Sequence, residues 1–230
     1  GSRHKRLSDT DLAEFDVSGM AQGGEPQMKL FKAEDAFTSA ILSVTQQHSS
    51  LVWITSGHGE KSAESTEPHG LSGLKDTLMG QDIAVETVTL LEREAIGSDV
   101  RLVIVPGPTH RFADQEAELL QTYLQRGGRL LALLDPLTDA GLDGPLERWG
   151  ISVGQDIVVD PARRLPFISP ANLFVTDYTE HAIVNKMKTL MTLFPLARSV
   201  NPTQPPPPGL TVTPLALTSE KGWGETTTSS

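Results

Sequence analysis

Hydrophobic residues in this chain fall into short aliphatic runs separated by segments of helical periodicity, a pattern that predicts alternating strands and helices. Three of the runs are unbroken and strand-sized, and a fourth alternates polar and apolar residues with a period of two. The four predicted strands cover residues 51–55 ("LVWIT"), 83–90 ("IAVETVTL"), 100–108 ("VRLVIVPGP") and 129–136 ("RLLALLDP"). Glycine, proline or polar residues follow each run, which is typical of strands that end in turns.

The segments between these runs carry apolar residues at helical spacing. The clearest, "ADQEAELLQTYLQRGG", has four large apolar residues on one face and acidic residues in its N-terminal half. Negative charge at a helix N-terminus is favourable, and the glycine pair at the other end predicts where the helix stops. Further helices are predicted at 33–47, 70–79 and 142–149, and "PQMKLF" before the first of them predicts an edge strand.

Unbroken aliphatic strands separated by helices indicate a parallel sheet covered on both faces. We therefore predict a doubly wound α/β domain with a mostly parallel sheet at residues 26–200. Residues 1–25 are polar and glycine-rich, which predicts a flexible lead-in. Residues 201–230 begin with "NPTQPPPPG", so a proline-rich extension with polyproline II conformation is expected there, followed by a possible returning strand in "LTVTPLALTS" and a loose tail.

Composition narrows the classes of function. The formal net charge of -10 argues against a nucleic-acid surface, which needs clustered Lys and Arg. The chain has no cysteine, which excludes disulfides, zinc–thiolate sites and thiol nucleophiles. No stretch reaches the roughly 18 apolar residues that span a bilayer. The opening Gly1–Ser2 is typical of a cleaved tag, so we expect a soluble fragment excised from a longer protein.

Three polar loops follow predicted strands and are the strongest candidates for chemistry: "TSGHGE", "PGPTHRF" and the pair "DP". Loops at the carboxyl ends of neighbouring parallel strands line the crevice where ligands bind in open α/β sheets. If these strands are neighbours, the loops form one ligand-binding crevice. The residues predicted to line it are Ser56, Gly57, His58, Gly59, Glu60, Pro108, His110 and Asp135.

Enzymatic alternatives use the same residues. A hydrolase could use Ser56, His58 and Asp135, but "TSGHG" lacks the first glycine of the G-x-S-x-G nucleophile elbow. A metal-dependent enzyme could use His58 and Glu60 with His110 or Asp135, but their spacing matches no local metal signature. "SGHGEKS" also lacks the spacing of a phosphate-binding loop, so Lys61 is interpreted as part of a solvated loop. We therefore predict no catalytic residues, no metal and no cofactor.

A purely structural interpretation stays open beside the crevice. Gly57 and Gly59 could supply positive φ angles for a tight turn. Glu60 could accept a hydrogen bond from a loop amide, and His58 could bond to a backbone carbonyl. His110 is expected to be exposed, and Asp135 could accept loop N–H groups at the end of its strand.

Several segments, taken in order, resemble the extracytoplasmic domain of the GldG-like family. Members of this family are auxiliary components of ABC-type transport systems and are named for gliding-motility proteins. The resemblance covers about residues 29–225. It is carried by "FKAEDAFTSAILSVTQ", "VWITSGHGEKS", "LVIVPGPTHRFADQEAELLQTYLQRGGRLLALLDP", "LERWGISVGQDIVVDP", "EHAIV", "FPLARSV" and "LTSEKGWGET".

This resemblance implies a flavodoxin-like or glutamine-amidotransferase-like fold without the catalytic cysteine of the latter group. It also implies a periplasmic location on the outer face of the bacterial inner membrane, with membrane helices beyond both ends of this fragment. The implied partners are ABC-transporter permease and ATPase subunits or other envelope proteins. Related domains, one of them in an intraflagellar transport protein, have been suggested to bind glycans, so a polysaccharide ligand in the crevice is a further expectation by analogy.

Overall fold

The computed structural model of the protein describes residues 7–16, 27–45, 50–163, 169 and 171–227. At its centre is a four-stranded parallel sheet in the order β4-β3-β5-β6. Its strands are β3 (Leu51–Thr55), β4 (Ala84–Val88), β5 (Val100–Pro106) and β6 (Leu130–Leu133), each within a run that the hydrophobic pattern predicts. The α/β class and the parallel sheet are therefore confirmed.

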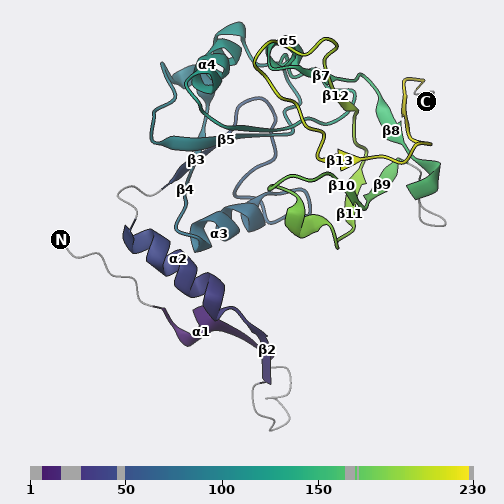
Figure 1. Ribbon diagram of the computed structural model, residues 1–230. Helices are drawn as coiled ribbons and strands as arrows, with labels where there is room; N and C mark the ends of the chain where they lie inside the picture. The colour runs from purple at the N-terminus through teal and green to yellow at the C-terminus, as the bar shows by residue number, and fades with distance from the viewer. Residues whose placement is uncertain (1–6, 17–26, 46–49, 164–168, 170, 228–230) are drawn as a thin grey trace.

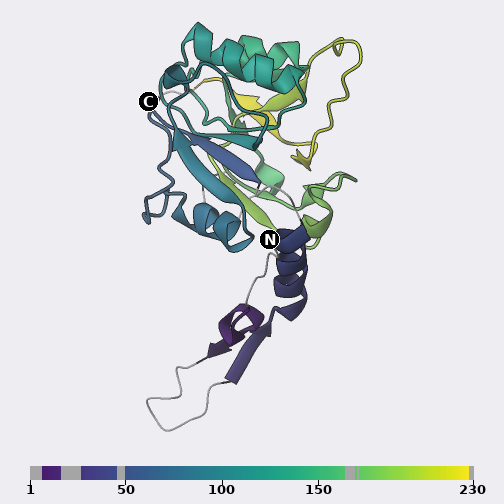
Figure 2. The same cartoon turned by 90° about the vertical axis from the view of Figure 1, so that its left-hand side faces the viewer.

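Helices cover both faces of this sheet because successive strand residues point to opposite sides. On one face, Val103 and Val105 pack with Leu120 and Tyr123 of α4 (Asp114–Gln125), and α5 (Asp143–Arg148) joins the same core. On the other face, strand residues pack against α3 (Ser72–Gly80); the residues of this second core include Val52, Ile54, Ile104, Leu74 and Leu78. Figure 2 shows α3 on one side of the sheet and α4 and α5 on the other.

The second half of the domain is built from small antiparallel pairs rather than from more parallel strands. The sequence did not predict this, because strands of two to four residues carry too little periodicity to recognise. The pairs are β7 (Ile151–Val153) with β12 (Val200–Pro202), β8 (Ile157–Val159) with β14 (Trp223–Glu225), β9 (Asn172–Val175) with β11 (Thr192–Pro195), and β10 (Asp177–Tyr178) with β13 (Ala216–Leu217). Single turns of 3-10 helix occur at η2 (Leu90–Glu92), η3 (Pro161–Arg163) and η4 (Asn185–Met187).

The proline-rich C-terminal segment returns to the domain. In the segment where a returning strand was expected, β13 pairs with β10, and in the segment expected to be a tail, β14 pairs with β8. Asp160, 1% exposed, fastens this return, because its carboxylate accepts the N–H and the hydroxyl of Ser219, both at 2.7 Å. Burial alone would raise the pKa of Asp160, but these bonds and the Ala162 N–H outweigh it and lower the pKa.

The N-terminal segments form a separate small unit that extends away from the central sheet in both views (Figures 1 and 2). Within the predicted flexible lead-in, α1 (Asp9–Leu12) and β1 (Ala13–Asp16) are ordered elements. The predicted edge strand is β2 (Gln27–Phe31), but it pairs with β1 rather than with the central sheet. The predicted helix is α2 (Ala33–Thr45).

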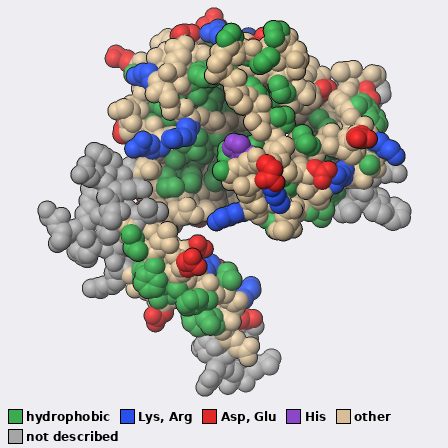
Figure 3. Space-filling model, in the orientation of Figure 1, with side chains coloured by type: hydrophobic (Ala, Val, Ile, Leu, Met, Phe, Trp, Pro, Cys, Tyr) green, Lys and Arg blue, Asp and Glu red, His purple; other side chains and the backbone are tan. Residues whose placement is uncertain are grey.

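Apolar side chains lie on the surface of this N-terminal unit, as the space-filling view in Figure 3 shows. The exposed large hydrophobic residues there are Phe15, Met28, Leu30, Phe31, Phe37 and Ile41. The amphipathic stripe that predicts α2 therefore does not face the core of the main domain. Among the described helices, none is both long enough and apolar enough to cross a membrane.

Candidate functional site

The loops predicted to line a crevice leave the central sheet where its strand order reverses. The chain leaves β3 for its neighbour β4 on one side, and β5 then lies on the other side of β3. The loops after β3 and β5 therefore diverge from adjacent strands at a topological switch point, which is where open α/β sheets bind ligands. The loop after β6 lies next to the loop after β5 at the same carboxyl end of the sheet. The three polar loops named from the sequence are therefore neighbours, as expected.

The glycine turn after β3 is required by close contact with the loop after β5. Gly57 and Gly59 have φ angles of +112° and +76°, in the region that favours glycine. A side chain at Gly59 would place its Cβ only 2.0 Å from Oγ1 of Thr109. The backbone carbonyl of His58 accepts the N–H of Thr109 at 2.9 Å and that of His110 at 3.0 Å. The two loops are thereby joined through their backbones.

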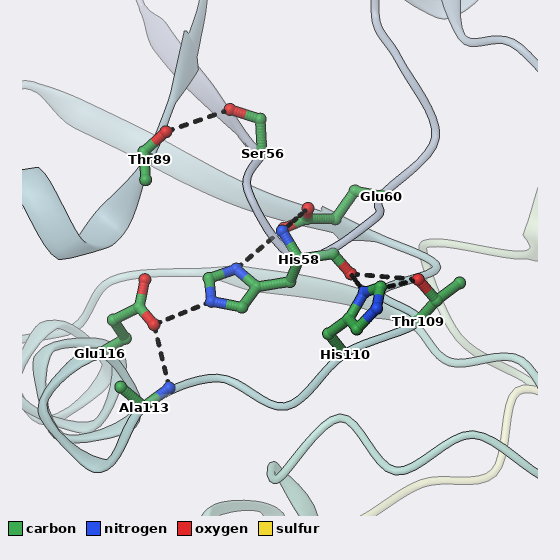
Figure 4. A network of polar contacts seen from close by, with 8 residues as sticks. All are labelled: Ser56, His58, Glu60, Thr89, Thr109, His110, Ala113 and Glu116. Atoms are coloured by element: carbon green, nitrogen blue, oxygen red, sulfur yellow. Dashed lines mark hydrogen bonds and ion pairs between the residues drawn. The ribbon is translucent and has the colours of Figure 1, made fainter.

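The His58 side chain points inward between two carboxylates, as Figure 4 shows. It is 14% exposed, its Nε2 lies 3.0 Å from Oε2 of Glu116, and its Nδ1 lies 3.7 Å from Oε1 of Glu60. Phe112 stacks on the ring with a centroid distance of 4.1 Å. The imidazole is therefore held on three sides by residues from three different segments.

Both carboxylates also satisfy backbone N–H groups. Glu116, 1% exposed, accepts the Ala113 N–H at 2.9 Å, so it caps the N-terminus of α4. Glu60 accepts the N–H of His58 at 2.6 Å, the loop-capping role that the structural interpretation assigned to it. One oxygen of each carboxylate and Nδ1 of His58 are buried and have no hydrogen-bond partner in the described part of the chain. These three atoms around the imidazole ring could therefore still form hydrogen bonds.

Lys61 makes the contact between the first loop and the loop after β6. Its Nζ lies 3.1 Å from Oδ2 of Asp135, and its backbone N–H donates to the carbonyl of Pro106 at 2.9 Å. Lys61 is partly exposed and ion-paired, so this loop residue also joins two of the three polar loops. Pro108 is fully buried, and His110 is exposed at the rim, as expected.

Ser56 does not join the His58 cluster. Its hydroxyl lies 3.5 Å from that of Thr89, its N–H donates to the carbonyl of Val88, and it has no polar contact with His58 among the described residues. Asp135 is paired with Lys61 instead of with the histidine. The contacts of Ser56, His58 and Asp135 therefore do not form the hydrogen-bonded chain of a catalytic triad. Nor do the described residues contain a group of three or more His, Asp or Glu side chains that could hold a metal ion.

Phe112, Glu116 and Thr109 contribute to the site but were not predicted from the sequence. Glu116 stands three residues after Ala113, a spacing that signals a capping carboxylate at the start of a helix. Nothing in the sequence indicates that this carboxylate also contacts His58, because the two residues are far apart along the chain and meet only after the sheet has formed.

A family model described as an ABC-type uncharacterized transport system matches residues 50–230. The mmIFT52 N-terminal domain is similar in structure, with a TM-score of 0.59 and 21% sequence identity over 76% of this chain and 76% of that one. At this identity the likeness concerns the fold alone. No curated protein matches the chain.

Proposed function

The chain belongs to the family of ABC-type uncharacterized transport system proteins, and on that premise we propose that it is a non-catalytic recognition domain of a transporter auxiliary protein. In this proposal the domain lies on the extracytoplasmic face of the bacterial inner membrane and the parent protein is membrane-anchored. Its partners are the permease and ATPase subunits of the transporter or another envelope protein. The finer GldG-like assignment, with a role in gliding motility, is part of the same proposal.

The observation that carries the proposal is that the polar side chains of the crevice are engaged in holding its loops. His58 contacts Glu116 and stacks on Phe112, and Asp135 pairs with Lys61. A general base must reach the proton that it abstracts, and among the described residues no serine or threonine hydroxyl bonds to the His58 ring. Rigid loops at a switch point, with an exposed rim at Thr109 and His110, suit recognition better than they suit catalysis.

A polysaccharide is a second ligand class, and a different region favours it. A cavity of about 610 Å³ lies beside β14 and combines exposed aromatic and polar side chains. Trp223 and Phe194 supply aromatic surface, and Asp156, Asn201 and Thr218 supply hydrogen-bonding groups. Apolar surface with a few polar groups is the usual composition of a small-molecule site, and it also suits the faces and hydroxyls of a sugar ring.

Cross-linking of the full-length protein in its native membrane tests the transporter proposal. We expect mass spectrometry of the purified, tagged protein to recover permease and ATPase subunits. His110→Glu, at the exposed rim of the crevice, should reduce that recovery about tenfold, equivalent to roughly 1.4 kcal/mol. His69→Glu is the matched control, since His69 is also exposed but belongs to another loop. Failure of the unmodified protein to capture any ABC subunit would contradict the proposal.

A hydrolase or metal-dependent enzyme that uses the same crevice is the alternative, and its test is turnover. Chromogenic esters, phosphates and glycosides are assayed with and without added divalent metal ions. Activity that is present in the unmodified protein and abolished in His58→Gln would replace the non-catalytic proposal with the enzymatic one. A glycan array tests the polysaccharide arm, with Trp223→Ala as the variant that should lose binding.

A further inference from the structure

Strand β6 is the edge of the central sheet, and one side of its backbone is unpaired. Val103 donates its N–H to the carbonyl of Arg129, and Gly107 donates to the carbonyl of Leu133. The backbone groups of every second residue of β6 therefore point toward β5. The backbone N–H and C=O groups of Leu130 and Ala132 point away from β5, toward the open edge of the sheet. Within the described residues these groups have no backbone hydrogen-bond partner. Such an edge is a template for another strand.

This open edge lines a cavity of about 810 Å³ whose walls are mostly apolar. Leu131 and Leu133, each 41% exposed, lie on one face of β6. Leu130 and Ala132 lie on the other face because side chains alternate along a strand. The other apolar walls come from Leu124 of α4, Leu146 of α5, Trp149, β7, residues 194–198 and 200, and residues 210–213 of the C-terminal return. The cavity therefore combines unpaired backbone groups with apolar surface on both faces of the strand.

Positive charge gathers where β6 ends. The charged residues that line the cavity are Lys61, Asp135 and Arg198; Lys61 pairs with Asp135, so Arg198 carries the net positive charge there. Arg198 is only 6% exposed, and it donates to the carbonyls of Gly154, Asp135 and Thr138. Its Nη2 is buried without a hydrogen-bond partner in the described part of the chain. A buried guanidinium with a free donor favours a carboxylate ligand.

We propose that this cavity binds the extended, apolar C-terminal tail of a partner protein, which adds to β6 as a fifth parallel strand. A strand parallel to the other four ends at the same carboxyl end of the sheet, so the terminal carboxylate of the tail meets Arg198 and Lys61. Main-chain bonds to Leu130 and Ala132 supply affinity, and alternate apolar side chains contact Leu131 and Leu133. This goes beyond the proposed transport function, because it concerns the β6 edge, which shares only Lys61 and Asp135 with the crevice, and does not require an ABC partner.

A second copy of the chain suits the cavity less well than a tail does. The edge of β6 forms one wall of the cavity, and β7, β12 and residues 210–213 form others. A single extended strand can enter such a space, whereas the β6 edge of another folded domain would bring its own β5 and covering helices with it. The lining segment of β6 and the residues that follow it, 130–135, match a tail of about six residues at roughly 3.3 Å per residue.

The probe is a fluorescein-labelled hexapeptide of alternating threonine and valine that ends in valine with a free carboxylate. We expect saturable binding to the whole chain by fluorescence anisotropy. The same peptide with a C-terminal amide should bind about tenfold more weakly. Leu133→Asp should weaken binding by at least about tenfold, while Leu190→Asp, an exposed leucine outside the cavity, should leave affinity within about twofold.

Hydrogen exchange distinguishes strand addition from simple apolar binding. The amide of Ala132 should become protected when the peptide binds, while that of Leu131, which already faces β5, should change little. No binding up to about 1 mM peptide would overturn the proposal. So would binding without protection at Ala132, and equal affinities for acid and amide would remove the carboxylate contact. Protection that rises with protein concentration in the absence of peptide would instead assign the edge to a second copy.

Discussion

Replacing Glu116 by alanine should destabilise the protein strongly, because two groups depend on one of its oxygens. Oε2 accepts the Ala113 N–H at 2.9 Å and lies 3.0 Å from Nε2 of His58. Glu116→Ala removes a helix cap worth about 1 kcal/mol. It also leaves polar groups buried without a partner, which costs about 1–3 kcal/mol more. We therefore expect the free energy of unfolding to fall by about 3 kcal/mol.

Glu116→Gln separates the shape of this side chain from its charge. The amide oxygen can occupy the position of Oε2 and keep both contacts. The amide nitrogen then takes the position of Oε1, which has no hydrogen-bond partner among the described residues. Because the acceptor is retained and a buried charge is removed, we expect a loss of less than about 1 kcal/mol.

Urea denaturation followed by tryptophan fluorescence measures both variants. Glu118→Ala is the matched control, because Glu118 is on the same helix but exposed and 3.8 Å from Arg148; its loss should stay below about 0.5 kcal/mol. A loss below about 1 kcal/mol for Glu116→Ala would refute the reasoning that the carboxylate holds the site together. Equal losses for the alanine and glutamine variants would show that charge, rather than the position of the acceptor, is what the site requires.

Two glycines and one buried aspartate lead to further predictions. Gly59→Ala should lower the free energy of unfolding by about 1–3 kcal/mol in the same denaturation assay, because φ is +76° and the new Cβ would meet Thr109. Gly73→Ala, in the first turn of α3 where a new Cβ would meet no atom within 4 Å, should instead raise it by up to about 0.5–1 kcal/mol; a loss there as large as that of Gly59→Ala would contradict the steric reasoning. The pKa of Asp160 is lowered in the folded state, so its contribution to stability is present above the ordinary value of 3.8 and is lost as pH falls through the lower folded pKa. Asp160→Asn should lower the free energy of unfolding at pH 7 by about 1–3 kcal/mol and should flatten the pH dependence of stability below pH 5. Thermal unfolding across pH measures both effects. A pH dependence below pH 5 that stays unchanged in the variant would show that the contact with Ser219 does not require the negative charge of Asp160.

Much of the first half of the domain could be predicted from the sequence. The four central strands and the helices α2, α3, α4 and α5 lie where the hydrophobic pattern places them, because each element is long enough to show its period. The second half could not be predicted in this way. Pairs such as β10 with β13 contain only two residues per strand, and their partners lie dozens of residues away along the chain.

The site divides along the same line. The sequence alone determined the class of fold, the glycine turn and the polar loops that follow β3, β5 and β6, since backbone conformation and burial act on local patterns. Only the tertiary structure decided the partners of those loops. It directed His58 to Glu116 and Phe112, directed Asp135 to Lys61 and kept Ser56 apart, because side-chain contacts depend on which strands become neighbours and on how α4 packs on the sheet. The open edge of β6 is likewise a property of the assembled sheet, since an aliphatic run has the same pattern whether one or both of its sides are paired.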